Sequence, residues 1–219
     1  MLSQYGASVH DVVGQKTLAM LNITNDRYAQ GTTSKFFKLL HSEFYVDFDL
    51  VHNSGWSALL SAVRAGRGAI EALNVLANVG VNMSREFLDG RTVLHLAAEM
   101  SWGSEVLKHI YESYGICDVN RQDRWGLTPL HYSVFSHPYR YDLWYQKVQY
   151  LLERGANPEL RGKTRWLVGS FNDTERTPYE IGCAIGPEVR RNFAEVLRQS
   201  GYPIPDESEQ EIFYDAVEK

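Results

Sequence analysis

Two stretches of the sequence decide the fold: DGRTVLHLAA at residues 89–98 and WGLTPLHYS at residues 125–133. They align without a gap, and their glycines, Gly90 and Gly126, lie 36 residues apart. Weaker copies occur as SGWSALLSA at residues 54–62, DVVGQKTL at 11–18 and ERTPYEI at 175–181. Self-similarity at a fixed spacing of this size predicts a protein built from stacked repeats.

Each copy is followed by a second segment that has the apolar spacing of a helix. The best example is VQYLLERGAN at residues 148–157, in which apolar residues recur three and four positions apart. Related segments occupy residues 72–80, 106–111 and 193–197, and a glycine closes or follows each of them. A glycine just past a helix readily adopts the left-handed conformation that ends it. Each repeat is therefore predicted to contain two helices.

A Thr-Pro-Leu-His helix start, followed by small residues and by an apolar helix ending in Leu-Leu-x-x-Gly-Ala, resembles the ankyrin repeat of about 33 residues. The resemblance covers nearly the whole chain. It implies an all-α ankyrin-repeat solenoid of stacked helix-turn-helix units joined by β-hairpin-like loops, with about five repeats including degraded ones. A single repeat cannot bury its own apolar face, so the repeats must stack on their neighbours.

The copies predict a single ankyrin-repeat domain over residues 1–219. Residues 1–10 are expected to end a preceding repeat or to cap the array, and they leave open that the chain is a fragment of a larger protein. The remaining segments are repeats at 11–51, 52–86, 87–122 and 123–160, an insertion at 161–174, a last repeat at 175–202, and an acidic tail or C-terminal cap at 203–219.

The repeated motif also has a direct physical interpretation. The Thr128 hydroxyl is placed to cap a helix, and Pro129 occupies the first helical position, where its missing N–H is not needed. The resemblance implies that His131 hydrogen-bonds this threonine and the neighbouring backbone. Thr92 and His95 match the same roles in the preceding copy. In the last copy Thr177, Pro178 and Glu180 have the form of a capping box.

Composition excludes several functional classes. The 219 residues are 44% apolar, which is enough to bury a core, and the net charge of −5 argues against a generic nucleic-acid binder. Two cysteines, Cys117 and Cys183, are too few for a disulfide scaffold or a zinc site. No apolar run is long enough to span a membrane, and no secretory signal is visible. We expect an intracellular protein, cytoplasmic or nuclear.

Few side chains suggest catalysis. His95 and His131 occupy equivalent places in successive repeats, so a structural role is favoured over a metal or catalytic pair. No nucleophile–base pair has supporting context, and we expect neither catalytic residues, nor a metal, nor a cofactor. Basic residues gather around the insertion at 161–174, where a solvated loop is favoured over a site for an anionic partner: Arg154, Arg161, Lys163 and Arg165.

Aromatic residues give a stronger functional signal. The chain has five tryptophans and thirteen tyrosines, and tryptophan, tyrosine and arginine are enriched at binding hot spots. The resemblance implies that a partner protein contacts the hairpin tips and the exposed face of the first helices. The residues expected there are Trp56, Arg64, Asp89, Arg91, Glu99, Arg124, Trp125, Leu127 and Phe135. We therefore predict a non-enzymatic protein-interaction module that uses the concave surface of its middle repeats.

Two other functions are kept open. The aromatic segment at 135–145, predicted to lengthen the connection between two helices, could line a pocket for a small molecule or an enzyme substrate. The array could also serve only as a spacer in a larger chain. For Trp102 and Trp144 we expect packing rather than binding.

Overall fold

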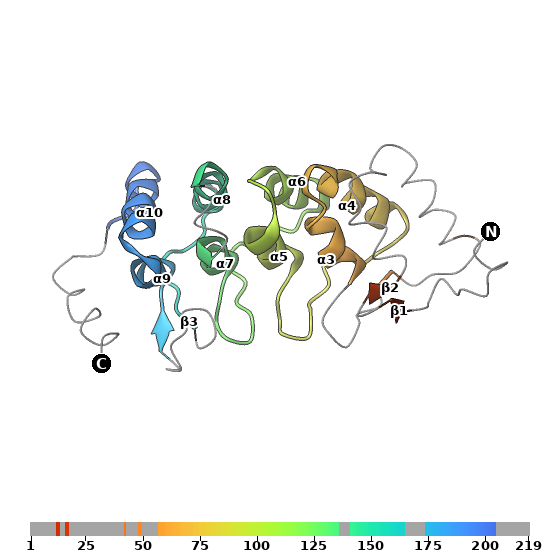
Figure 1. Cartoon of the computed structure of the whole chain (residues 1–219), viewed down its shortest axis with the longest axis horizontal. Helices are drawn as coiled ribbons and strands as arrows, with labels where there is room; N and C mark the ends of the chain where they lie inside the picture. Colours follow the sequence, from red (N-terminus) through yellow and green to blue (C-terminus); the bar gives the residue numbers. More distant parts are fainter. Residues whose placement is uncertain are drawn as a thin grey trace.

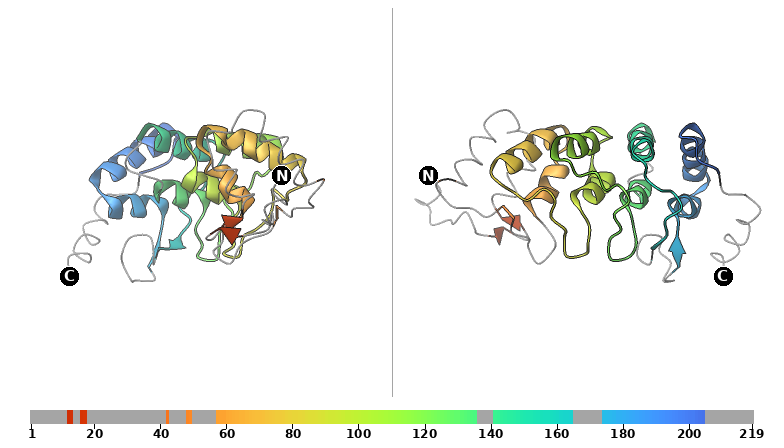
Figure 2. Two further views of the ribbon diagram at one scale, coloured as in Figure 1. Left: turned by 45° about the vertical axis from the view of Figure 1, so that its right-hand side comes forward. Right: turned by 180° about the vertical axis from the view of Figure 1, so that it is seen from behind.

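The computed structural model describes residues 12–13, 16–17, 42, 48–49, 57–135, 141–164 and 174–204. Within these residues, four antiparallel helix pairs stack in sequence order to form one row (Figure 1). The first helix of each pair lies in one layer and the second helix in another, and both layers persist when the molecule is turned (Figure 2). The predicted all-α stack of helix-turn-helix units is confirmed.

The first helices are α3 (Ala58–Val63), α5 (Val93–Met100), α7 (Pro129–Phe135) and α9 (Pro178–Ile185). The second helices are α4 (Ala69–Asn78), α6 (Glu105–Tyr114), α8 (Tyr141–Glu153) and α10 (Pro187–Gln199). A 3-10 turn, η3 (Gly66–Gly68), precedes α4. Antiparallel strand pairs are β1 (Val12–Val13) with β2 (Lys16–Thr17), and β3 (Gly162–Lys163) with β4 (Glu175–Arg176).

The core lies between the two helix layers and continues from one pair to the next. Helix α5 packs against both α3 and α7, and α10 packs against α8 and α9. The largest fully buried side chains come from all four pairs and include Leu73, Leu94, Leu107, Leu130, Tyr132 and Phe193. Each pair thus buries its apolar face mainly against adjacent pairs, as a repeat array must. No helix of the described residues is both long and apolar enough to cross a membrane.

The histidines of the motif connect successive repeats. His95 Nδ1 accepts the Thr92 backbone N–H at 3.0 Å and lies 2.9 Å from the Thr92 hydroxyl. Its Nε2 donates at 3.2 Å to the carbonyl of Leu127, a residue near the start of the next repeat. His131 repeats this arrangement with Thr128 at 3.0 and 2.8 Å and with the Arg176 carbonyl at 3.1 Å.

Loops that precede the first helices form three projecting fingers. We call residues 87–91 the first finger, residues 123–127 the second, and the β3–β4 pair the third. The Arg124 N–H donates to the Asp89 carbonyl at 3.0 Å, and the Lys163 N–H donates to the Trp125 carbonyl at 2.7 Å. The backbone therefore links the fingers side by side. Gly126, with φ +78°, is required because a Cβ there would lie 3.0 Å from the Arg161 carbonyl oxygen.

The aromatic segment at 135–145 differs from its prediction. Helix α8 begins at Tyr141, so the end of this segment is helical and only residues 136–140, which lie outside the described residues, separate α7 from α8. The reason is periodicity, because Trp144, Val148 and Leu151 follow helical spacing and are all buried. Trp144 packs beside Phe193 with ring centroids 6.1 Å apart, in agreement with the packing role expected for it. Much of the first predicted repeat, 11–51, and nearly all of the tail also lie outside the described residues.

Candidate functional site

A chain of ion pairs crosses the first finger and helix α5. The Arg91 guanidinium lies at its centre, with Nε 2.6 Å from an Asp89 carboxylate oxygen and Nη1 2.9 Å from a Glu99 carboxylate oxygen. The same guanidinium lies 5.6 Å from the centroid of the Tyr132 ring, within cation–π range. One cation thus holds together two carboxylates and an aromatic ring from three elements of the fold. We call Asp89, Arg91, Glu99 and Trp125 the palm.

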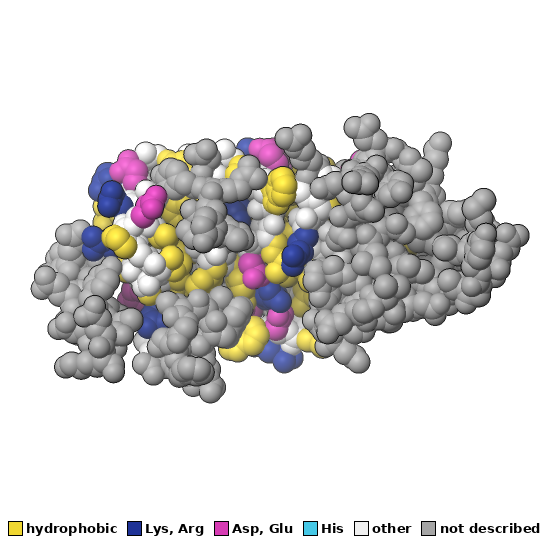
Figure 3. All heavy atoms as spheres, viewed as in Figure 1, with side chains coloured by type: hydrophobic (Ala, Val, Ile, Leu, Met, Phe, Trp, Pro, Cys, Tyr) yellow, Lys and Arg dark blue, Asp and Glu magenta, His cyan; other side chains and the backbone are white. Residues whose placement is uncertain are grey.

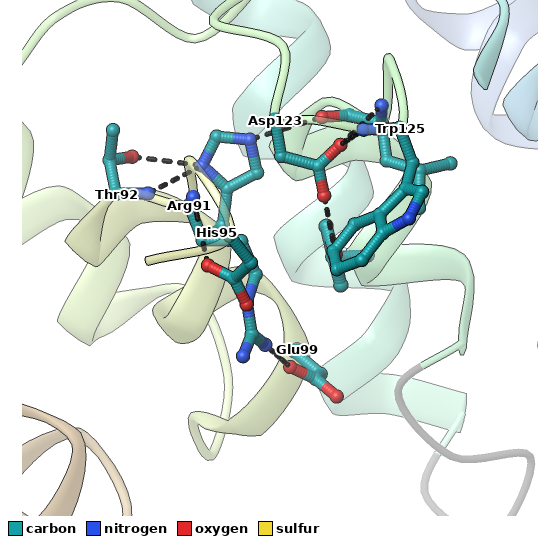
Figure 4. Close-up of polar contacts among 9 residues, drawn as sticks. Arg91, Thr92, His95, Glu99, Asp123 and Trp125 are labelled. Atoms are coloured by element: carbon teal, nitrogen blue, oxygen red, sulfur yellow. Dashed lines mark hydrogen bonds and ion pairs between the residues drawn. The ribbon is translucent and has the colours of Figure 1, made fainter. Parts of the chain in front are cut away.

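A buried hydrogen-bond network between Asp123, Tyr132 and the backbone fixes the second finger. The Tyr132 hydroxyl donates to Asp123 Oδ2 at 2.7 Å. Asp123 Oδ1 accepts the backbone N–H groups of Trp125 and Leu127, each at 2.9 Å (Figure 4). Burial raises the pKa of Asp123, and burial next to this carboxylate raises the pKa of Tyr132. Such a satisfied buried network holds the finger that carries Trp125 in one conformation.

Two charges, Glu99 of the palm and Lys147 of α8, lie near the end of α5. Burial raises the pKa of Glu99, while the positive charges of Arg91 and Arg64 act in the opposite direction. The Lys147 ammonium from α8 is buried and donates to the Ala98 carbonyl at 2.7 Å, close to the end of α5. Burial lowers the pKa of Lys147 to about 7, and the Glu99 charge opposes that shift. Glu99 and Lys147 therefore lie close enough for the charge of each to oppose the pKa shift that burial causes in the other.

The structure places most of the predicted partner-binding residues at or near the surface. Arg64 and Arg124 are exposed, and the other residues expected there are partly buried at the surface: Asp89, Arg91, Glu99, Trp125 and Phe135. Figure 3 shows side chains of both charges gathered beside hydrophobic ones over the middle of the molecule. Leu127 is 0% exposed, so it belongs to the core and is removed from the predicted surface. Trp56 lies outside the described residues.

Two exposed apolar side chains were missed. Leu88 at the tip of the first finger is 72% exposed. Its position beside Asp89 in the predicted hairpin loop could have indicated this exposure from the sequence. Trp102, for which packing was expected, is 54% exposed at the junction of α5 and α6. Its indole lies against Gly66, where an added Cβ would be 3.6 Å from the ring. Both residues belong to the repeat that carries Arg91 and Glu99.

The motif histidines and the aromatic segment do not form a second site in the described residues. His95 and His131 each direct Nε2 at a backbone carbonyl, so their ring nitrogens are engaged in the scaffold. No group of three histidine, cysteine, aspartate or glutamate side chains among the described residues could hold a metal ion. Tyr145 donates to Gln199, and Trp144 is buried, so both of these side chains of α8 are engaged within the array.

Comparison with known proteins agrees with this architecture. The family model described as ankyrin repeats (3 copies) matches residues 27–123 and 65–162, which together cover more than half of the chain. Human NF-kappa-B inhibitor zeta is 30% identical over 154 residues, which are 66% of this chain. The match spans only 19% of that relative's length. Ankyrin repeats are generally protein–protein interaction modules. With four stacked helix pairs and the motif hydrogen bonds in place, the chain belongs to the ankyrin-repeat family.

Proposed function

We propose that this chain is a non-enzymatic protein-binding module whose partner contacts the palm and the tips of the first two fingers. The observation that carries the proposal is the juxtaposition of Arg91, which is fixed by two carboxylates, with exposed Leu88 and Arg124 on adjoining fingers. A fold alone does not determine function, but this surface combines charge, an apolar tip and an aromatic ring. The resemblance to ankyrin repeats implies partner contacts at such hairpin tips and first helices.

Rigidity supports a binding role for this surface. Arg91 is held at both edges of its guanidinium, and Trp125 follows a backbone that Asp123 fixes through two hydrogen bonds. Side chains that are already ordered lose little conformational entropy when a partner docks, so more of the contact energy appears as affinity. Arginine and tryptophan are also the residue types most enriched at energetic hot spots.

The relative supports a protein as the class of partner. Its name describes an inhibitor of NF-kappa-B. Since the match covers a fifth or less of that protein, we carry over only the class, a protein partner, and leave the identity of the partner to experiment. The chemistry of the surface predicts a partner segment that offers an apolar side chain to Leu88 and negative charge to Arg124, which forms no ion pair with another described residue.

A capture experiment with matched variants tests the proposal. The full chain is immobilised, and the proteins that it retains from a cell extract are compared with those retained by the double variant Leu88→Asp/Arg124→Glu. Arg191→Glu, an equally exposed charge reversal on α10, is the control. We expect the double variant to lose a protein that the wild type and the control both retain, with circular-dichroism melting curves unchanged. Equal retention by all three proteins would contradict the proposed surface.

A further inference from the structure

A buried arginine in the third finger has no charge partner among the residues that the structure describes. Arg176 is only 6% exposed, and none of the described carboxylates lies within ion-pair distance of it. Its Nη1 donates to the Thr164 hydroxyl at 2.7 Å, while Nε is buried without a hydrogen-bond partner. Arginine is almost never fully buried unless it is paired, and an isolated buried charge is strongly unfavourable. Within the described part of the chain, this guanidinium therefore lacks the anion that a buried arginine requires.

Strand geometry explains why the side chain is buried. Gly162 pairs with Arg176 across the β3–β4 hairpin, so these residues and Thr164 lie on the same face of the strands. That face is buried, whereas Lys163 and Glu175 lie on the opposite, exposed face. An added Cβ on Gly162 would lie 2.6 Å from a Leu127 methyl carbon and 2.8 Å from the Gly126 backbone. The Arg176 face of the third finger is thus turned towards the second finger.

Acidic groups near Arg176 among the described residues are engaged elsewhere. The Glu180 carboxylate accepts two hydrogen bonds from Arg161, at 3.1 and 2.6 Å, and one from the Thr177 N–H at 2.9 Å, in the capping box of α9. Glu175 lies on the exposed face of the hairpin. The Thr164 hydroxyl, which accepts from Arg176, donates in turn to the Thr174 carbonyl at 3.4 Å. The described part of the finger thus supplies a cation and a neutral hydroxyl but no anion.

We propose that Arg176 is the docking point for one acidic side chain of the protein partner at the third finger. This inference rests on the proposed function and adds a partner chemistry to it. The Nε–Nη2 edge of the guanidinium forms no hydrogen bond to a described residue and presents two parallel N–H donors. A carboxylate matches that edge in geometry and in charge, since it carries one negative charge and two acceptors.

Binding of a labelled acidic peptide tests the inference. Fluorescence anisotropy measures the affinity of the full chain for a fluorescein-labelled hexaglutamate peptide at low salt. Arg176→Met removes the buried charge at similar volume, and Lys163→Met removes a charge from the exposed face of the same hairpin. We expect Arg176→Met to weaken binding about tenfold, as loss of a bidentate charge pair predicts, and Lys163→Met to change it far less. Equal losses in the two variants would mean general electrostatic attraction and would overturn the inference.

A second measurement uses the wild type and does not depend on the folding of a variant. At millimolar concentrations, where general exclusion of the salt from the protein surface is negligible, sodium glutamate should raise the melting temperature above that in sodium chloride of equal ionic strength, because an anion that binds the native state stabilises it. No difference between the salts would count against the site, and a larger rise in sodium phosphate would assign it to phosphate instead. Unchanged capture of the partner by Arg176→Met would overturn the inference. It would leave the proposed function intact, since the double variant Leu88→Asp/Arg124→Glu does not alter Arg176.

Discussion

Lowering the pH from 7 to 5 is expected to destabilise the array through two buried histidines. Burial lowers the pKa of His95 and of His131 from 6.5 to about 4. In both residues Nδ1 accepts a threonine N–H and Nε2 donates to a carbonyl, an arrangement that only the neutral ring allows. Because the folded pKa lies below the unfolded value, the unfolded chain binds more protons between pH 6.5 and 4, and stability falls as the pH falls through that window.

The magnitude follows from the two pKa values. For a group that titrates at 6.5 when unfolded and at about 4 when folded, moving from pH 7 to pH 5 lowers the free energy of unfolding by about 2 kcal/mol. His95 and His131 together therefore account for about 4 kcal/mol, a large part of the typical stability of a domain. Below pH 4 both rings are protonated in either state, and their contribution stops changing.

Replacement by glutamine isolates this effect. Glutamine fits the third helical position of a capping box, and Glu180 already occupies that position in the last repeat. In His95→Gln/His131→Gln the amide oxygen can accept the threonine N–H and the amide nitrogen can donate, but neither titrates. Urea unfolding followed by circular dichroism at pH 7 and pH 5 should show the wild type losing about 4 kcal/mol more than the double variant. Equal losses in the two proteins would refute the reasoning.

Three further outcomes are expected from the scaffold. Lys147→Met should be neutral or stabilising at pH 7 in urea unfolding, because it removes an ammonium group whose charged form burial disfavours, as its lowered pKa indicates. Only the wild type should then gain stability towards pH 9, since its folded pKa of about 7 lies below the unfolded 10.5. Gly126→Ala should lower the free energy of unfolding by about 1–3 kcal/mol, and Gly115→Ala should lower it less. Both glycines have positive φ, but an added Cβ would meet the Arg161 carbonyl oxygen at position 126 and no atom within 4 Å at position 115. Thr177→Ala should lower the melting temperature through loss of its cap, about 1 kcal/mol of stability.

Sequence alone predicted the features that depend on local chemistry. Thr128, Pro129 and His131 specify a helix start within four residues, and the same order recurs at Thr92 and His95. The capping box of the last repeat also follows from residue spacing, and the structure contains both of its hydrogen bonds between Thr177 and Glu180. These interactions span only three residues, so no knowledge of distant packing was needed.

Features that depend on contacts between repeats were harder to predict. Leu127 was assigned to the surface because it follows the tip of the second finger, yet the finger turns there and its side chain meets Gly162 of the third. Tyr132 was not assigned a role, because its partner Asp123 lies nine residues away across the turn from finger to helix. The exposure of Trp102 likewise depends on how the α5–α6 junction meets Gly66 of the preceding repeat.

The division of charges across this surface bears on how a partner is selected. In the palm, Arg91 is already matched by Asp89 and Glu99, so a partner that approaches it meets a locally balanced set and gains little from charge alone. Arg124 forms no ion pair with a described residue, and Arg176 is buried without a described carboxylate partner. Attraction of an acidic partner must therefore come mainly from the second and third fingers, while the palm supplies a rigid shape. Because truncating one member of a buried charge pair costs much more than removing an exposed charge, specificity should depend more on Arg176 than on Arg124.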